Sequence, residues 1–296
     1  MVEGQETGFS VGRDVLGDDP VVRDCLVEGV GFRVTELVCH EDRRSFRPTI
    51  VRGVPDTPVL LVLFVRSGGF LLRAGGREEF IDPAMGFVIC QGDEAAVSHP
   101  VRTCDVSTLL EIGQGVHDSV SAPRAPQGMP VAAGLDLAHR SLVAACRAGV
   151  DPSEALERVC DLLARLSGGP FPDASGRRAS TVLAHRRIVH QIRAALIEGP
   201  LTMGLEELSR QVGCSPFHVS RIFRWVTGQT LTGYRNLLRV RAVAEEIAEG
   251  QPLRVLAAKY GFADQAHMTR VFRRHAGAVP SSVRDLLQPA GAVHRN

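Results

Sequence analysis

Two arginine-rich segments near the carboxyl end of the chain repeat each other. Residues 220–224 (SRIFR) match residues 269–273 (TRVFR) at an offset of 49, and Gly228 matches Gly277 at the same offset. Each segment follows a short amphipathic pattern and a tight turn at a glycine. A short helix, a turn and a second helix, present twice, predict an all-α region built from two helix–turn–helix units.

Within each repeat the spacing of apolar residues predicts one buried helix face and one outward face. A helix fits the major groove of DNA, where arginine can bond guanine bidentately and glutamine can bond adenine. Two such helices joined by one stiff helix suit successive major grooves, about 34 Å apart. The side chains that we predict to contact DNA are Phe217, His218, Ser220, Arg221 and Arg224 in the first repeat and Gln265, Ala266, Thr269, Arg270 and Arg273 in the second.

The charge distribution favours the same interpretation. The whole chain has 34 Lys and Arg against 33 Asp and Glu. From Ser180 onward there are 16 against 8, a net charge of +8, which leaves −7 for the preceding residues. A basic region beside an acidic one indicates a polyanion-binding module joined to something else. A merely solvated basic helix face is the alternative, and both the repetition and the local charge argue against it.

The N-terminal half has the pattern of a strand-rich domain. Short apolar runs, such as 58–66 and 106–112, are separated by glycine, proline and aspartate, and residues 70–81 predict a hairpin about a Gly-Gly turn. Such a series indicates a small barrel or jelly roll. Helical periodicity follows at 135–150 and 152–166, which predicts a helical hairpin.

The repeats are part of a longer pattern of residues. It consists of Ser215, Pro216, 218–224, Gly228, Tyr234, Arg239, Ala242, Ala257, Gly261, Phe262, Asp264, 270–273, Gly277, Pro280 and Arg284. In this pattern residues 182–287 resemble the DNA-binding domain of the AraC/XylS-type transcription regulators. The chain departs from the family at Ala266, where serine is frequent, and at Met268, where phenylalanine is frequent. Met268 keeps the apolar contact, whereas Ala266 leaves the readout near it open.

The resemblance implies a fold for the whole chain, because the family usually joins this domain to a cupin-like barrel and a helical dimerisation hairpin. We therefore expect an α+β fold: an N-terminal cupin-like β-barrel with a helical dimerisation hairpin, then an all-α domain with two helix–turn–helix units. The expected segments are a flexible N-terminus at 1–20, the regulatory barrel at 21–130, the hairpin at 131–167, a Gly/Pro/Ser-rich linker at 168–180 and the AraC-type DNA-binding domain at 181–296.

The expected function is sequence-specific binding of double-stranded DNA by a transcription regulator that the cupin-like domain tunes. We expect a homodimer, to which an apolar stripe of Leu156, Val159, Leu163 and Leu166 contributes, and RNA polymerase is a candidate further partner. No apolar run approaches the ~18 residues of a membrane span. The first residues also lack a signal-peptide pattern, so we expect a cytoplasmic protein.

The effector of the N-terminal half stays open at this stage. Metal-dependent cupin enzymes use an H-x-H pair, which this half lacks, so we expect no enzyme; a cupin enzyme fused to a DNA-binding module is the alternative. Cys39, His99 and Cys104 are candidate ligands for a soft or borderline metal, or a thiol-based sensor. Cysteines that only fill the core are the competing explanation, and an organic effector, or none, is also possible. The seven cysteines form no C-x-x-C pair, which argues against a disulfide framework.

Overall fold

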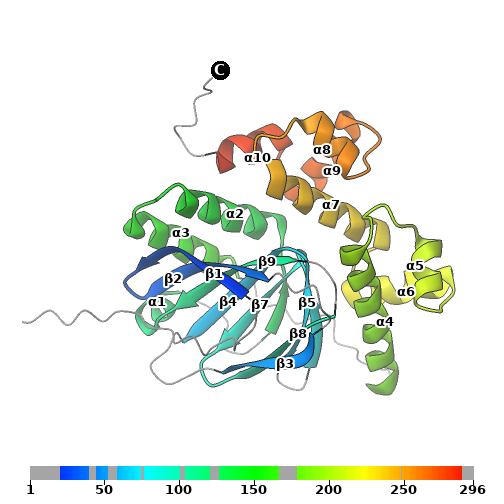
Figure 1. The fold of residues 1–296 in the computed structure, drawn as a ribbon, viewed down its shortest axis with the longest axis horizontal. Coiled ribbons are helices and arrows are strands. Elements are labelled where there is room, and N and C mark those ends of the chain that lie inside the picture. Colours follow the sequence, from blue (N-terminus) through cyan, green and yellow to red (C-terminus); the bar gives the residue numbers. More distant parts are fainter. Residues whose placement is uncertain are drawn as a thin grey trace, which may run out of the picture.

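The fold is a mixed α+β one, with strands in the N-terminal part and helices in the C-terminal part (Figure 1). The predicted flexible segment 1–20 lies outside the residues that the structure describes, as does 168–178 of the predicted linker. The computed structural model describes residues 21–39, 45–52, 59–74, 77–100, 104–120, 127–166, 179–247 and 249–288.

The strands form two antiparallel sheets, one of six strands in the order β1-β2-β9-β4-β7-β10 and one of four in the order β3-β8-β5-β6. The predicted hairpin at 70–81 is confirmed, since β5 pairs with β6 and Phe70 lies opposite Ile81. The strands are β1 (Val21–Gly29), β2 (Phe32–Cys39), β3 (Ser45–Arg52), β4 (Leu60–Ser67), β5 (Phe70–Ala74), β6 (Arg77–Ile81), β7 (Met85–Cys90), β8 (Glu94–His99), β9 (Asp105–Ile112) and β10 (Gln127–Pro130). A short helix, α1 (Gln114–Ser119), follows β9.

The structure supports a strand-rich N-terminal region but does not show a closed cupin-like barrel. Among the described residues no strand pairing joins the two sheets. Instead the sheets pack face to face around an apolar core that draws on both of them. Its members include Leu61, Val65, Phe70, Leu72, Ile81 and Phe87.

Strand β4 shows why this part of the sequence reads as a continuous apolar run. Leu60, Val62 and Phe64 belong to a core beneath two helices on the outer face of the six-stranded sheet. Leu61 and Val65 belong to the core between the sheets. Successive side chains of a strand point to opposite faces, so a strand covered on both faces needs apolar residues at nearly every position.

The two helices on that outer face are α2 (Ala133–Arg147) and α3 (Pro152–Ala164), which confirms the predicted helical hairpin (Figure 1). The α3 helix begins at an N-cap aspartate, Asp151, whose side chain accepts a hydrogen bond from the backbone N–H of Ser153. Proline at the first helical position suits this start, because its missing N–H would have no partner there.

The apolar stripe of α3 requires a correction. Val159 and Leu163 are fully buried, and Leu166 nearly so, within the chain itself. They pack beneath the hairpin with residues of the six-stranded sheet, which supplies the surface that the stripe needs. Only Leu156 of the four stripe residues is half-buried. The stripe therefore belongs mainly to the core of the chain itself, and most of it is not exposed for contact with a second copy.

The C-terminal part is all-α, as the sequence predicts, and has seven helices among its described residues. They are α4 (Ala179–Glu198), α5 (Leu205–Gln211), α6 (Pro216–Thr227), α7 (Leu231–Ile247), α8 (Leu253–Lys259), α9 (Gln265–Ala276) and α10 (Pro280–Leu287). Helix α7 joins two separate cores: Leu231, Tyr234 and Leu238 pack with α4, α5 and α6, whereas Val243 and Ile247 pack with α8, α9 and α10. No helix of the described part of the chain is long and apolar enough to cross a bilayer.

Candidate nucleic-acid interface and N-terminal cavity

The first helix–turn–helix unit consists of α5 and α6. Gly213, in the turn between them, has φ +65°, a backbone conformation that suits glycine because it has no Cβ. Ser215 then caps α6: its Oγ accepts a hydrogen bond from the backbone N–H of His218 at 3.3 Å. Gly228 ends α6 in the left-handed conformation. The turn and both ends of α6 are thus fixed by local sequence.

The second unit, α8 and α9, repeats this construction. Gly261 has φ +67° in the turn, and Gly277 ends α9 in the left-handed conformation. The N-cap differs, because Asp264 takes the place of the serine and its carboxylate accepts from the backbone N–H of His267 at 2.6 Å. Both predicted helix–turn–helix units are therefore present, and each has a glycine turn and a capped second helix.

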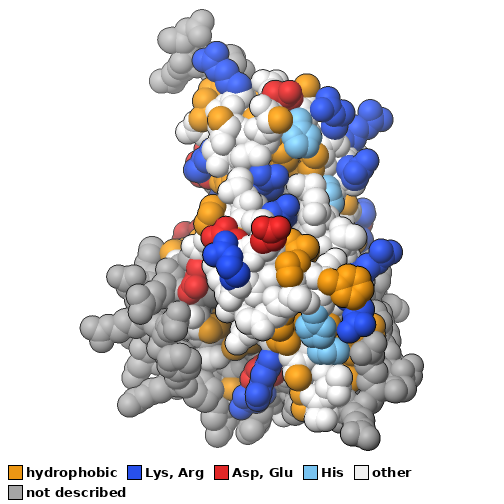
Figure 2. All heavy atoms as spheres, turned by 90° about the vertical axis from the view of Figure 1, so that its right-hand side faces the viewer, with side chains coloured by type: hydrophobic (Ala, Val, Ile, Leu, Met, Phe, Trp, Pro, Cys, Tyr) orange, Lys and Arg blue, Asp and Glu red, His pale blue; other side chains and the backbone are white. Residues whose placement is uncertain are grey.

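Most of the predicted DNA-contact side chains lie on the exposed faces of α6 and α9. His218 and Thr269 are the two that are half-buried. Phe217 is 76% exposed, and the guanidinium of Arg221 lies 5.9 Å from the centre of its ring. The exposed set is Phe217, Ser220, Arg221, Arg224, Gln265, Ala266, Arg270 and Arg273. Figure 2 looks at the side that carries α5 and α6 and shows basic side chains gathered along its right-hand edge.

Helix α7 also positions both units through arginines that face the turns. The Arg235 guanidinium donates to the backbone carbonyl of Met203, just before α5. One turn later, Arg239 donates to the carbonyl of Gly261 in the second unit, and its guanidinium lies 5.0 Å from the centre of the Phe262 ring. The separation of the two units is therefore set by one continuous helix.

A buried ionic cluster attaches the first unit to the sheets. Asp82, between β6 and β7, is fully buried and accepts hydrogen bonds from Arg193 of α4, at 3.0 Å, and from the Tyr234 hydroxyl of α7. Arg193 also pairs with Glu79 at 3.2 Å. Burial lowers the pKa of the Arg193 guanidinium, but Asp82, Tyr234 and Glu79 together more than offset this, so its pKa lies above the usual value.

A second cluster attaches the far end of α7. Glu245 pairs with Arg66 of β4 at 2.9 Å and with Arg140 of α2 at 2.6 Å. Arg66 also pairs with Glu36 of β2, and Arg140 with Asp136. Among these contacts only Tyr234 belongs to the pattern recognised in the sequence. Asp136 and Arg140 are four residues apart on α2, but the other partners lie far apart in the chain, and nothing in their local sequence marks them as pairs.

A cavity of about 400 Å³ lies between the two sheets. Its walls are mainly apolar, with Leu61, Leu63 and Leu72 among the lining residues. Polar side chains follow one pair of strands, where Arg33 and Glu111 lie opposite each other. Burial raises the pKa of the Glu111 carboxyl, an effect that Arg33 at 3.7 Å opposes.

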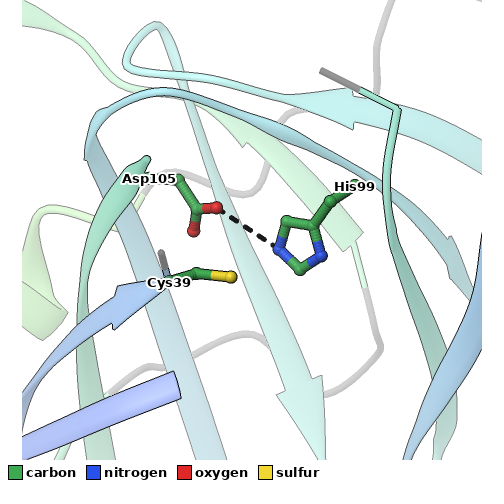
Figure 3. A group of neighbouring side chains, drawn as sticks. All are labelled: Cys39, His99 and Asp105. Carbon is green, nitrogen blue, oxygen red and sulfur yellow. Dashed lines mark ion pairs between the residues drawn. The ribbon is translucent and has the colours of Figure 1, made fainter. Parts of the chain in front are cut away.

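At the other end of the same strand pair the side chains of Cys39, His99 and Asp105 point toward one another (Figure 3). One ligand atom from each lies within 4.8 Å of the other two. Two of the three predicted metal-site residues, Cys39 and His99, are thus brought together. The third, Cys104, is exposed, and Asp105 stands in the group instead. All seven cysteines lie in described segments, and none of them forms a disulfide.

Comparison with known proteins places this geometry in a family. The model of a helix-turn-helix domain matches residues 208–285. The multiple antibiotic resistance protein MarA of Escherichia coli K12 is 33% identical over 89 residues, which is 30% of this chain and 68% of MarA. The HTH-type transcriptional regulator RipA of Corynebacterium glutamicum is 33% identical over 97 residues, 32% of this chain and 29% of RipA. The crystal structure of ToxT from Vibrio cholerae O395 matches 88% of this chain and all of ToxT, with 9% identity and a TM-score of 0.36.

This chain has two capped helix–turn–helix units in a basic helical region and matches known regulators there. It therefore belongs to the class of DNA-binding transcription regulators. Within that class, this chain belongs to the AraC/XylS family. The resemblance noted from the sequence is therefore confirmed.

Proposed function

We propose that this regulator reads double-stranded DNA through the exposed faces of α6 and α9, each in a major groove. The observation that carries the proposal is the matched exposure of Arg221 and Arg270 at the same position of two equally capped helices. Arginine at such a position can bond guanine bidentately. The proposed contact residues are Phe217, His218, Ser220, Arg221, Arg224, Gln265, Ala266, Thr269, Arg270 and Arg273.

Salt dependence tests this proposal. A preferred site is first selected from a pool of random duplexes with the full chain, and its dissociation constant is then measured over a range of salt concentrations. We expect the logarithm of the binding constant to fall linearly with the logarithm of salt, with a slope of about −0.9 per phosphate contacted. A slope near zero, or a pool that yields no preferred sequence, would overturn the proposal.

We further infer that the N-terminal part is a cupin-like regulatory unit and that its cavity receives a small effector. The cavity of about 400 Å³ has the size and apolar lining of a small-molecule site. The two ion clusters that join this part to α4 and α7 offer a physical route from the cavity to the DNA-reading units. The segments expected from the sequence, 21–130, 131–167 and 181–296, serve here as the proposed regulatory, dimerisation and DNA-binding units.

The remaining proposals concern partners. We propose a regulator without catalytic activity, which its likeness to transcription regulators supports. It acts on DNA in the cytoplasm, with RNA polymerase as a further partner.

We also propose a homodimer through the outward face of the α2–α3 hairpin, where Leu156 and Cys160 are half-buried. Light scattering at tens of micromolar should show the dimer in the wild type and monomer in Leu156→Asp. A monomeric wild type would reject it, and Leu163 is no probe because it is buried within the chain.

A further inference from the structure

Three side chains of different chemistry meet at one end of the cavity. Cys39 ends β2, Asp105 begins β9 directly opposite it in the sheet, and His99 ends β8 of the other sheet. The His99 Nε2 and Asp105 Oδ1 atoms are 3.3 Å apart. Cys39 and Asp105 are buried, and the His99 side chain is only 13% exposed. Figure 3 shows the sulfur, the imidazole and the carboxylate converging from these three strands.

The geometry points to a site for one divalent ion of the zinc class, held by Cys39 Sγ, His99 Nε2 and an Asp105 carboxylate oxygen. Thiolate, imidazole and carboxylate are the ligands that zinc takes in proteins, with bonds of about 2.0–2.3 Å. Ligand atoms around a tetrahedral ion with such bonds are about 3.3–3.6 Å apart. The histidine–aspartate pair already has this separation, and because the sulfur lies within 4.8 Å of the other two ligand atoms, it needs to move by about 1.5 Å or less to reach it.

The backbone holds this group firmly. Cys39 and Asp105 are partners in the regular β2–β9 ladder. Gly68 lies against the start of β9, where a Cβ would come within 2.6 Å of the Asp105 Cα atom. The His99 ring packs 5.8 Å from the Phe70 ring, centre to centre. Ligands on strands of two packed sheets are preorganised, which favours metal binding over a group that must assemble from loops.

Strand geometry also explains why Asp105, rather than its neighbour Cys104, completes the group. Consecutive residues of an extended chain point to opposite faces. Asp105 lines the cavity, whereas the Cys104 side chain is exposed. Cys104 is therefore a matched control cysteine, one residue away from a proposed ligand.

Three protein ligands leave the fourth tetrahedral position open, which is the arrangement of sites that bind a further molecule. All three ligands line the cavity, close to the apolar side chains of Leu37 and Phe70. The open position thus faces the cavity and suits a lone-pair donor group on a mainly apolar small molecule. This last step rests on the proposed effector role of the cavity, whereas the metal site itself stands without it.

Cobalt(II) is the probe for the site. The full chain is treated with a chelator, then titrated with Co(II) and back-titrated with Zn(II). We expect one Co(II) per chain, with a thiolate-to-cobalt charge-transfer band and the intense visible bands of a tetrahedral ion. Azide added to the cobalt form should shift the visible bands, since it can occupy the open position. If azide leaves the visible bands unchanged, the proposal that the fourth coordination position is open is wrong.

Variants separate the proposed ligands from their neighbour. Cys39→Ala should abolish the charge-transfer band, and His99→Gln and Asp105→Asn should each weaken binding at least about 10–100-fold, the loss that even an outer-shell change causes. Cys104→Ala should bind as the wild type does. A band that survives Cys39→Ala, or one lost in Cys104→Ala, would overturn the assignment. Near-ultraviolet circular dichroism verifies that each variant is folded.

A measurement on the unaltered protein covers the case in which Cys39→Ala does not fold. X-ray absorption at the zinc edge of the wild type should show one sulfur at about 2.3 Å and nitrogen or oxygen ligands at about 2.0 Å. A shell without sulfur, or with two sulfurs, would overturn the site. DNA binding is measured separately on the same samples, so loss of DNA binding with an intact cobalt spectrum would contradict the proposed function and leave the metal site standing.

Discussion

The two helix–turn–helix units are alike where they face outward and different where they meet the rest of the chain. Each has a glycine turn, a capped second helix and an exposed arginine at a matching position. The first unit's core reaches Ala84 in the turn between β6 and β7, beside the buried Asp82 cluster. The second unit's core instead takes in Leu137 and Ala144 of α2, beside the Glu245 cluster.

This difference indicates that reading DNA and being coupled to the N-terminal part place separate demands on a repeated unit. Under the proposed function, the outward faces carry the same kind of side chain because both contact DNA. The attachments differ because each unit meets a different element of the two-sheet region. A ligand that moves the β6–β7 turn would therefore act first on the first unit, and one that moves α2 on the second.

The largest effect that separates the two attachments is expected from Asp82→Ala. Asp82 is fully buried, and its removal leaves the buried Arg193 guanidinium with the Tyr234 hydroxyl at 2.7 Å and the more distant carboxylate of Glu79 at 3.2 Å. Loss of one partner of a buried ion pair costs about 3–5 kcal/mol. Glu245→Ala should cost less, about 1–3 kcal/mol, because both of its arginine partners keep another carboxylate. Denaturant unfolding of the full chain measures both values.

The control for this pair is Glu206→Ala, which removes an exposed carboxylate from α5 and should leave the free energy of unfolding nearly unchanged. Equal losses for Asp82→Ala and Glu245→Ala would show that the two attachments are energetically equivalent, contrary to the comparison.

The second largest effect is expected at the two turn glycines, Gly213 and Gly261, which should differ in how much their replacement by alanine destabilises the chain. Both have positive φ, so alanine at either position costs about 1–2 kcal/mol in backbone conformation. At Gly213 a Cβ would meet no atom within 4 Å, whereas at Gly261 it would lie 2.3 Å from Thr202 Cγ2 and 2.7 Å from Arg239 Nη2. Overpacking adds about 1–3 kcal/mol, so Gly261→Ala should be clearly the more destabilising. Thermal unfolding compares the two variants, and a reversed order would contradict this account of the second turn.

Replacing the matched arginines tests the similarity of the outward faces. Arg221→Ala and Arg270→Ala should each weaken binding to the selected site by about 1–3 kcal/mol if each side chain holds a bidentate base contact. The loss should be smaller on random DNA. Arg73→Ala, on an exposed arginine of β5, is the control and should change neither value. Equal losses on both kinds of DNA would assign that arginine to phosphate contacts.

The smallest expected effect concerns the N-caps. Ser215→Ala and Asp264→Ala each remove an acceptor at a helix start, which costs about 0.5–2 kcal/mol. The aspartate should matter more, because its hydrogen bond is 2.6 Å long against 3.3 Å and its charge interacts favourably with the helix dipole. Circular dichroism during unfolding measures both. Asp264→Asn should be less destabilising than Asp264→Ala. A larger cost for Ser215→Ala than for Asp264→Ala would contradict the expectation that the aspartate is the stronger N-cap.

The repeat allowed the DNA-reading part to be predicted closely from the sequence. Glycine at 213, 261 and 228, and an N-cap at Ser215, are local devices that act over a few residues. The short helix predicted before each glycine turn appears as α5 in the first unit and as α8 in the second. Strand β4 was also predictable, since a run of apolar residues needs burial on both faces. Strands β1 and β10, by contrast, escaped prediction because their side chains are neither regularly alternating nor strongly apolar.

What the sequence determined by itself is therefore the chemistry that depends on neighbours in the chain: helix periods, caps, turns and the two outward faces of a DNA-binding regulator. The tertiary structure decided which distant residues meet. It buried the α3 stripe against a sheet, paired Asp82 with Arg193, and set Asp105 rather than Cys104 beside Cys39 and His99. Such contacts depend on strand register and on the packing of sheets, which shift a side chain to the opposite face with a change of one residue.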